Sequence, residues 1–321
     1  DETQLKYRAM VNMNANTYTE TTFHPSALVT SGWTGDNVNR SYMRDYKSLQ
    51  FTTRHNLIFT PAFKNNDHFL TMTAQYELYT GTNSGQTETT YGLPTGNITS
   101  TTVGSYLSKA GTSTGEWRSM SFAYQSHYSY KSKYSLGFTL RAEGNTKFGA
   151  DEKWGFFPAI SGRWNISDEP WMKWSRDVVD NFKLRGNYGA LGNANISAYQ
   201  SLETIGIGKS GVLFNGSKVP VAGTPTNVPD GLTWEKVYTW DVGMDLDLLN
   251  SRLSFSGDFY VRDTKDLYIT GTELPAIYGA SAPKGNYGAL RTRGWELTLS
   301  WRDQIDLAGK PGIGLGRQHR M

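Results

Sequence analysis

Residues 240–262 read WDVGMDLDLLNSRLSFSGDFYVR, and their pattern decides the fold class. Apolar and polar residues alternate from Trp240 to Leu248 and again from Leu253 to Val261. Such alternation is typical of β-strands with one apolar and one polar face, and the brief interruption at 249–251 is typical of a hairpin turn. Helical periodicity is nearly absent, and segment 169–180 is at most a short connector. The sequence therefore predicts an all-β protein.

The same alternation recurs along the chain, and we expect about twelve antiparallel strands. Their approximate ranges are 3–16, 49–60, 68–80, 116–130, 133–143, 157–166, 182–190, 199–207, 211–221, 233–248, 252–262 and 294–302. We see no domain boundary and no short-period repeat, so the 321 residues are expected to form one unit.

Composition alone does not decide whether the protein lies in a membrane or in water. Apolar residues make up 37% of the chain, and no run approaches the roughly 18 apolar residues of a spanning helix. A membrane-spanning strand needs only about 9–11 residues, of which alternate ones face lipid. The 13% aromatic content, with 10 Trp and 19 Tyr, suits a membrane boundary. It equally suits a soluble β-sandwich with a tyrosine-rich face, so composition leaves both open.

The lengths of the connections favour the membrane. Long segments at 17–48, 81–115 and 263–293 alternate with short ones such as 61–67, 131–132 and 249–251. Outer-membrane barrels combine short periplasmic turns with long external loops, and a soluble sandwich has no reason to do so. Segment 167–181 breaks the rule, because it is about as long as the neighbouring 144–156. The sequence therefore predicts an antiparallel transmembrane β-barrel.

The polar faces of these strands would then line the lumen. Their charges have mixed signs, which predicts cross-strand pairs that stiffen the wall or contact a plug. A binding or conducting path for a polar solute is the alternative. The charged residues concerned are Lys6, Arg8, Arg141, Glu143, Lys183, Arg185, Asp241, Asp245, Asp247, Asp258, Glu296 and Arg302.

Other chemistry finds little support. There are no cysteines, and a net charge of +3 on 61 charged residues does not indicate nucleic acid. The five histidines lack metal-site spacing, so we expect no metal. Residues 206–211 match G-x-G-x-x-G, but neither the strand before nor the helix after that a dinucleotide site needs is evident. Counting carboxylates does not exclude a glycosidase-like pair. However, the period-two spacing of Asp241, Asp245 and Asp247 is that of a lumen face. We expect no enzyme activity and no cofactor.

One block is more specific than any short motif. Residues 140–149, LRAEGNTKFG, and 153–169, KWGFFPAISGRWNISDE, closely resemble a stretch of SusC/RagA-like TonB-dependent outer-membrane proteins. Further similar segments follow in the family's order. They are 183–189 with Gly192-Asn193, 232–235, 245–260, 264–267, 286–288 and 293–297. The clear similarity covers about 133–302, whereas residues 1–130 fit by pattern only.

The resemblance implies a 22-stranded barrel that imports oligosaccharides or peptides across the outer membrane. A plug domain would fill its lumen, the TonB complex would energise it, and a SusD-like surface lipoprotein would cap it. Substrate contacts would come from aromatic residues on long loops, and we single out Trp33, Tyr91, Tyr278 and Tyr287. These four could equally be ordinary loop or membrane-boundary aromatics.

Some features depart from the family. Glu143 stands where the family usually has Asp, and the opening residues do not resemble a signal peptide. We expect residues 1–321 to lack the plug, and beyond Trp301 we expect no further family strand. We therefore expect residues 1–321 to be a partial barrel from an incomplete or frameshifted coding region, with too few strands to transport anything alone. The alternatives are a passive porin-like channel and a soluble β-rich carbohydrate-binding or hydrolytic protein, which would be extracted without detergent.

Overall fold

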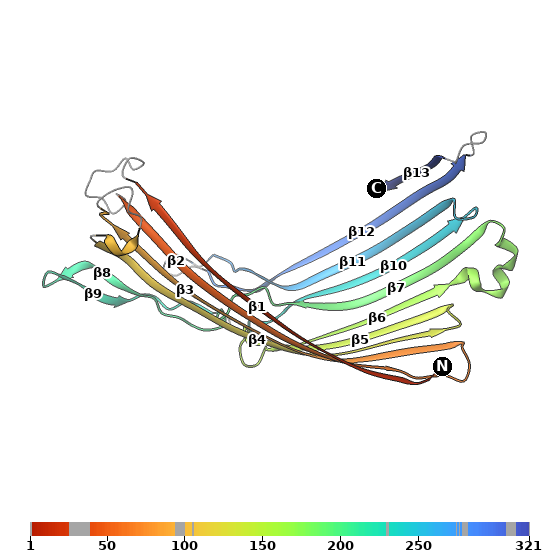
Figure 1. Ribbon diagram of the computed structural model, residues 1–321, viewed down its shortest axis with the longest axis horizontal. Helices are drawn as coiled ribbons and strands as arrows, with labels where there is room; N and C mark the ends of the chain where they lie inside the picture. Colours follow the sequence, from red (N-terminus) through yellow and green to blue (C-terminus); the bar gives the residue numbers. More distant parts are fainter. Residues whose placement is uncertain are drawn as a thin grey trace. The chain divides into compact units, whose positions relative to one another are not determined.

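The computed structural model describes residues 2–25, 39–93, 100–104, 106–228, 231–273, 275, 277, 282–305 and 313–320 (Figure 1). Eleven strands hydrogen-bond into one sheet in the order β1-β2-β3-β4-β5-β6-β7-β10-β11-β12-β13, and β8 and β9 form a separate pair. The strands are β1 (Gln4–His24), β2 (Arg40–Thr60), β3 (His68–Tyr91), β4 (Tyr106–Tyr130), β5 (Tyr134–Asn145), β6 (Trp154–Asn165), β7 (Val179–Asn193), β8 (Ile207–Phe214), β9 (Ser217–Ala222), β10 (Glu235–Leu248), β11 (Leu253–Thr270), β12 (Lys284–Ile305) and β13 (Ile313–Arg320).

Helical structure is confined, in these ranges, to 3₁₀ turns. They include η2 (Thr101–Val103), η3 (Ile166–Asp168) and η4 (Pro170–Ser175). A search of the same residues finds no helix with the length and apolar character needed to cross a membrane. The predicted connector at 169–180 corresponds to η4 and the turn that follows it.

The all-β prediction is confirmed, with two corrections around residues 199–222. The strand predicted at 199–207 is wrong, because the chain turns at Tyr199 (φ 65°) and Leu202 N–H bonds locally to the Tyr199 carbonyl at 3.0 Å. The strand predicted at 211–221 is a hairpin, β8–β9. Its turn residues, Asn215 (φ 48°) and Gly216 (φ 76°), both adopt left-handed backbone conformations. Asn-Gly is the strongest short hairpin signal in a sequence, so the sequence did contain this information.

A third correction concerns the end of the sheet. No strand was expected beyond residue 302, yet β13 pairs with Thr298–Ile305 of β12 in antiparallel register. Pairing of this kind uses the backbone N–H and C=O groups that every non-proline residue carries, so a short segment with little apolar alternation can extend a sheet.

The chain divides into two compact units, which we describe separately. The first comprises residues 1–8, 55–76 and 121–321, and the second comprises 9–54 and 77–120. In the first unit, β5, β6, β7, β10, β11 and β12 lie side by side with antiparallel pairing (Figure 1).

The connections of this first unit differ at the two ends of its strands. The end we call the long end carries 146–153, the 194–234 excursion with the β8–β9 hairpin, and 271–283. The end we call the short end carries 131–133, 166–178 and 249–252. The predicted tight turns are confirmed, with positive φ at Lys131 and Ser132 and at residues 249–251. Segment 166–178 remains the exception in length, because it contains η3 and η4.

The apolar faces of the strands in this unit are uncovered. Val242 on β10 is 61% exposed, and Trp295 on β12 is 62% exposed. Tyr188 packs on Trp240 across β7 and β10 with ring centroids 4.4 Å apart, yet Trp240 is itself exposed. A continuous exposed apolar face on a soluble protein would drive association, so this face requires an apolar surrounding.

Candidate functional site

The polar face of the first unit is organised around Arg185, in the middle of β7. Its guanidinium forms ion pairs with Asp245 on β10, at 3.3 Å, and with Asp258 on β11, at 2.6 Å. Ser256 donates a hydrogen bond to Asp245 at 2.7 Å and completes the group. Charge-assisted hydrogen bonds are about twice as strong as neutral ones, so this network fastens three adjacent strands to one another.

Gly243 makes this network possible. It lies directly opposite both Arg185 on β7 and Asp258 on β11 in the strand register. A Cβ atom at Gly243 would lie 2.2 Å from Asp258 Oδ1 and 2.7 Å from Arg185 Cζ. The ion pair therefore crosses β10 over a position that only glycine leaves open.

Other polar-face residues form simpler pairs. Asn187 donates to Asp241 at 3.1 Å, and Asn181 donates to Asp247 at 2.9 Å, in both cases from β7 to β10. In the second unit, Arg54 on β2 pairs with Glu77 on β3. The predicted pairing of opposite charges across strands is thus observed for Arg185, Asp245 and Asp258, whereas Asp241 and Asp247 accept from neutral asparagine amides. Arg141 instead pairs with Glu143 on its own strand at 2.8 Å.

A packed aromatic core, which we call the Trp234 core, lies at the long end of the first unit. Trp234 is only 2% exposed and contacts Phe148 and Phe157, with ring centroids 4.9 and 5.5 Å away. Ile196 and Leu232 complete the cluster. The indole N–H of Trp234 donates to the Lys153 carbonyl at 3.2 Å. This hydrogen bond satisfies the only polar group of the side chain, which would otherwise be buried without a partner.

The Trp234 core joins connections that are far apart in sequence. Phe148 comes from 146–153, whereas Ile196 and Leu232 come from the two ends of the 194–234 excursion. Asn286, near the start of β12, links the excursion to the neighbouring strands. Its side chain accepts from Thr233 N–H at 2.9 Å and donates to the carbonyls of Thr233 and Asp266. Segments 232–235 and 286–288 were quoted above as separate sequence similarities, and the structure brings them together.

One charged group lies beside this core. Partial burial in connection 146–153 lowers the pKa of the Lys147 ammonium below its ordinary value. Its Nζ atom lies 3.5 Å from the Ala194 carbonyl of the excursion. Lys147 therefore adds a second link between the two connections.

Two of the four aromatic residues predicted to contact substrate are described, and both lie in strands, which corrects their predicted place on long loops. Tyr91, at the end of β3 in the second unit, stacks on Tyr106 at the start of β4 with centroids 5.2 Å apart. Tyr287, on β12 in the first unit, is exposed, and its ring covers Gly271, where a Cβ would approach within 3.0 Å. Trp33 and Tyr278 lie outside the described residues.

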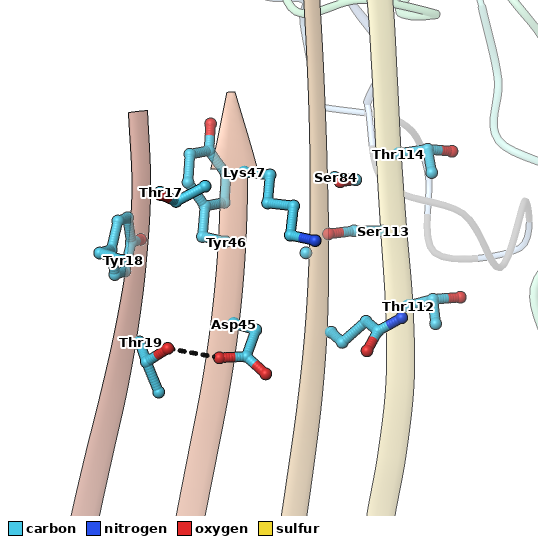
Figure 2. A pocket seen from close by; sticks show the side chains of 12 residues that line it. Thr17, Tyr18, Thr19, Asp45, Tyr46, Lys47, Ser84, Thr112, Ser113 and Thr114 are labelled. Carbon is cyan, nitrogen blue, oxygen red and sulfur yellow. Dashed lines mark hydrogen bonds between the residues drawn. The ribbon is translucent and has the colours of Figure 1, made fainter. Parts of the chain in front are cut away.

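The second unit contains a polar hollow of about 570 Å³ that sequence reasoning missed (Figure 2). Thr19 donates to Asp45 at 2.6 Å, and Tyr18 stacks on Tyr46 with centroids 5.1 Å apart. Asp45 is the sole carboxylate among the described residues that line it, so the hollow offers hydrogen bonds rather than a catalytic carboxylate pair. Its lining is Thr17, Tyr18, Thr19, Asp45, Tyr46, Lys47, Ser84, Gly85, Gln86, Thr112, Ser113 and Thr114.

Metal chemistry has no evident location in the part of the chain that the structure describes. No group of three or more His, Cys, Asp or Glu side chains lies close enough there to hold a metal ion. The G-x-G-x-x-G residues fall at the start of the β8–β9 hairpin, where Gly208 and Gly211 occupy β8 and no helix follows.

Comparisons with known proteins agree with this architecture. Residues 2–315 match the family described as TonB dependent receptor-like, beta-barrel. TonB-dependent receptor P39 of Formosa agariphila is 36% identical over 175 residues, which is 54% of this chain and 16% of that protein. TonB-dependent receptor SusC of Bacteroides thetaiotaomicron is 31% identical over 178 residues, which is 54% of this chain and 17% of that protein.

Solved structures show the same fold. The RagAB peptide importer in its closed-closed state superimposes with a TM-score of 0.78 at 19% identity, covering 99% of this chain and 35% of that one. The outer membrane transporter YddB from Escherichia coli gives a TM-score of 0.55 at 10% identity, covering 94% and 38%. At such identities the likeness concerns the fold alone.

The chain belongs to the TonB-dependent receptor-like β-barrel family. The resemblance to SusC/RagA-like proteins and the prediction of an outer-membrane β-barrel are confirmed. The chain spans less than a fifth of the length of the curated relatives it matches. In such barrels the short turns lie on the periplasmic side, so the short end faces the periplasm and the long end faces the cell exterior.

Proposed function

We propose that the protein forms part of the wall of a TonB-dependent importer that takes up oligosaccharides or peptides. The observation that carries this proposal is the match to the receptor family over residues 2–315. The relatives are named as receptors, and we propose that this protein likewise has no catalytic activity. A SusD-like surface lipoprotein and the TonB complex would be its partners.

The polar face supports a path for a polar solute. Along β7, β10 and β11, Arg185 pairs with Asp245 and Asp258, and the amides of Asn181 and Asn187 donate to two further carboxylates. Each of these carboxylates has a hydrogen-bond donor, and the wall presents a surface of polar groups that can hydrogen-bond to a solute. Uncharged glycans and peptides fit such a lining.

The long end supports a surface that meets large solutes or a protein partner. The Trp234 core and the Asn286 hydrogen bonds fasten the described parts of two surface connections, 146–153 and 194–234, to each other and to β12. Fixed loops lose less conformational entropy on binding than mobile ones. We propose that Tyr91 and Tyr287, together with Trp33 and Tyr278, contact the solute, because aromatic rings stack on sugars and on peptide side chains.

Uptake measurements with the intact protein in its outer membrane test the proposal. Cells would be supplied with labelled oligosaccharides or with labelled peptides of matched size. We expect one class to accumulate, and accumulation to stop when TonB is removed. Uptake that persists without TonB would identify a passive channel and contradict the proposal.

Purification in detergent tests the proposed partner. Affinity capture of the intact protein should retain a surface lipoprotein in about equal amount. A preparation that imports solute but never contains such a lipoprotein would refute this part of the proposal.

Single substitutions test the aromatic contacts. Tyr287→Ala should weaken uptake by about 5- to 30-fold in KM, as expected from 1–2 kcal/mol of lost ring contact. Tyr124→Ala on the apolar face of β4 is the matched control, because Tyr124 is also exposed. Equal effects of the two substitutions would show that Tyr287 acts only through the stability of the wall.

A further inference from the structure

The periplasmic connection between β6 and β7 has three distinct faces. In the segment from Ile166 to Ser175, every third residue is buried: Ile166, Glu169, Met172 and Ser175. A 3₁₀-helix has three residues per turn, so side chains three apart lie above one another. Local hydrogen bonds follow the same spacing, from Glu169 N–H to Ile166 at 3.0 Å and from Met172 N–H to Glu169 at 3.1 Å. One face of the connection is therefore fastened to the protein.

A second face carries tryptophan. Trp171 and Trp174 are three residues apart and are 57% and 81% exposed. Asp168 and Asp177, both exposed, lie at the two ends of this face. The third face carries cations, because Lys173 and Arg176 are exposed with the same spacing. Two indole rings held outward beside two cations are not needed by the fold, which buries the other face.

The buried face rests on the apolar side of the sheet. Glu169 accepts hydrogen bonds from the Tyr134 hydroxyl at 2.5 Å and from the Trp164 indole N–H at 3.1 Å. Tyr134 and Trp164 are directly opposite each other on β5 and β6, and their rings stack. Tyr134 shares its face of β5 with Leu136 and Phe138, both exposed apolar residues, because alternate residues of a strand share a face. The connection thus folds back toward the lipid side of the wall.

We propose that η4 is an anchor in the headgroup layer of the periplasmic leaflet. Trp171 and Trp174 would lie at the boundary with the hydrocarbon, and Lys173 and Arg176 would contact phospholipid phosphates. Tryptophan prefers this boundary, and exposed cations beside apolar rings are typical of segments that lie in the headgroup region. Because the connection lies at the short end, it is at the depth of the periplasmic headgroups. The hydrogen bonds of Glu169 hold it on the lipid-facing side of the wall.

A depth measurement tests the anchor directly. The chain has no cysteine, so Trp174→Cys introduces a unique site in it for a nitroxide label. Lys64→Cys, exposed in the turn between β2 and β3, is the matched control at the short end. Asp67 of that turn pairs with Lys131 of the neighbouring short-end turn. The intact protein would be labelled, reconstituted in phosphatidylethanolamine–phosphatidylglycerol vesicles, and exposed to oxygen and to a water-soluble nickel chelate.

We expect oxygen to dominate relaxation of the label at 174 and the nickel chelate to dominate at 64. Equal nickel accessibility at the two sites would overturn the proposal, because it would place η4 in water. Low accessibility to both reagents at 174 would also overturn it, because it would indicate a covering protein.

The cationic face has its own test. In vesicles of phosphatidylcholine alone, the label at 174 should become more accessible to nickel than in vesicles containing phosphatidylglycerol. Lys173→Gln with Arg176→Gln should abolish this difference while leaving the folded barrel intact, since both side chains are exposed. A lipid dependence that survives the double substitution would refute the phosphate contact. Neither measurement depends on import, so the anchor and the proposed function can fail separately.

Discussion

The two connections that flank β7 make opposite use of tryptophan. At the cell-surface end, the 194–234 excursion buries Trp234 against Phe148 and Phe157. At the periplasmic end, the 166–178 connection leaves the Trp174 side chain exposed. Both connections are fastened to the sheet, so the difference is not one of order against disorder.

The difference reflects what surrounds each connection. A surface loop is bathed in water, so its large apolar rings must find protein partners, and the Trp234 core supplies them. A segment beside the lipid boundary can leave rings exposed, because the membrane itself takes them up. The contrast between Trp234 and Trp174 therefore separates a ring that stabilises the protein from one that anchors it.

Replacing each tryptophan by alanine gives the largest expected contrast. Trp234→Ala should cost about 3–5 kcal/mol, because it empties the centre of a packed core. Trp174→Ala should change stability by less than about 0.5 kcal/mol, because the ring has few protein contacts. Thermal unfolding in detergent, which removes the bilayer, measures the two effects on equal terms.

Limited proteolysis gives the same comparison locally. Trp234→Ala should speed cleavage within 194–234 and leave 166–178 unchanged. Similar losses of stability in the two variants would contradict the assigned roles.

The position of Phe157 in the core depends on two glycines. A Cβ at Gly192 would lie 2.0 Å from Phe157 Cζ, and one at Gly155 would lie 2.3 Å away. Gly192→Ala should therefore displace the ring and cost about 1–3 kcal/mol, as overpacking does in other cores. Gly162→Ala on β6 is the matched control, because a Cβ there meets nothing within 4 Å.

The unfolding temperatures of the two glycine variants are compared with that of the unaltered protein. Only Gly192→Ala should lower the unfolding temperature. A destabilised Gly162→Ala would show instead that alanine is tolerated poorly anywhere in these strands.

Between the two connections, Arg185 tests whether the middle of β7 behaves independently. Arg185→Met removes the partner of Asp245 and Asp258, and should cost about 1–3 kcal/mol for charged hydrogen bonds lost. The cost falls in the lower part of that range because all three side chains are partly exposed. The unfolding temperature should fall, while proteolysis within 194–234 stays as in the unaltered protein. Faster cleavage there would show that the wall and the Trp234 core are coupled.

The sequence predicted the wall better than its ends. Alternation such as that of 240–262 identified ten strands of the sheet, because a face that meets lipid imposes strict periodicity. The charges on the polar face were predicted as pairs, but the partners of Arg185 depend on register, which alternation alone does not give. The hairpin at 207–222 was not predicted, although the Asn215-Gly216 pair is a strong hairpin signal.

The packing of the connections at the two ends of β7 could not be predicted from the sequence, for a different reason. Trp234 and Phe148 are 86 positions apart, and their packing follows from how connections 146–153 and 194–234 fold against each other. The connector at 169–180 was predicted, but its 3₁₀ form was not, because buried residues three apart fit neither the helical nor the strand period. Nothing in the sequence alone distinguished Trp234 from Trp174.

The smallest expected effect is a pH dependence at the periplasmic connection. The hydrogen bonds donated by Tyr134 and Trp164, with the ammonium of Lys133 nearby, hold the pKa of the Glu169 carboxyl below its ordinary value. Since the folded pKa is the lower one, the carboxylate stabilises the fastened connection above the ordinary glutamate pKa of about 4.3. That contribution is lost as the pH falls from there through the folded pKa.

A nitroxide at Trp174→Cys should therefore become more mobile between pH 5 and pH 3. In a Glu169→Gln background the label should already be more mobile at pH 7 and should respond little to acid, because the amide does not titrate. The label at Lys64→Cys should be indifferent to both changes, since its turn makes no contact with Glu169 among those the structure describes. An acid response that persists unchanged in Glu169→Gln would assign it to another group, and Glu169 would then hold the connection through its shape rather than its charge.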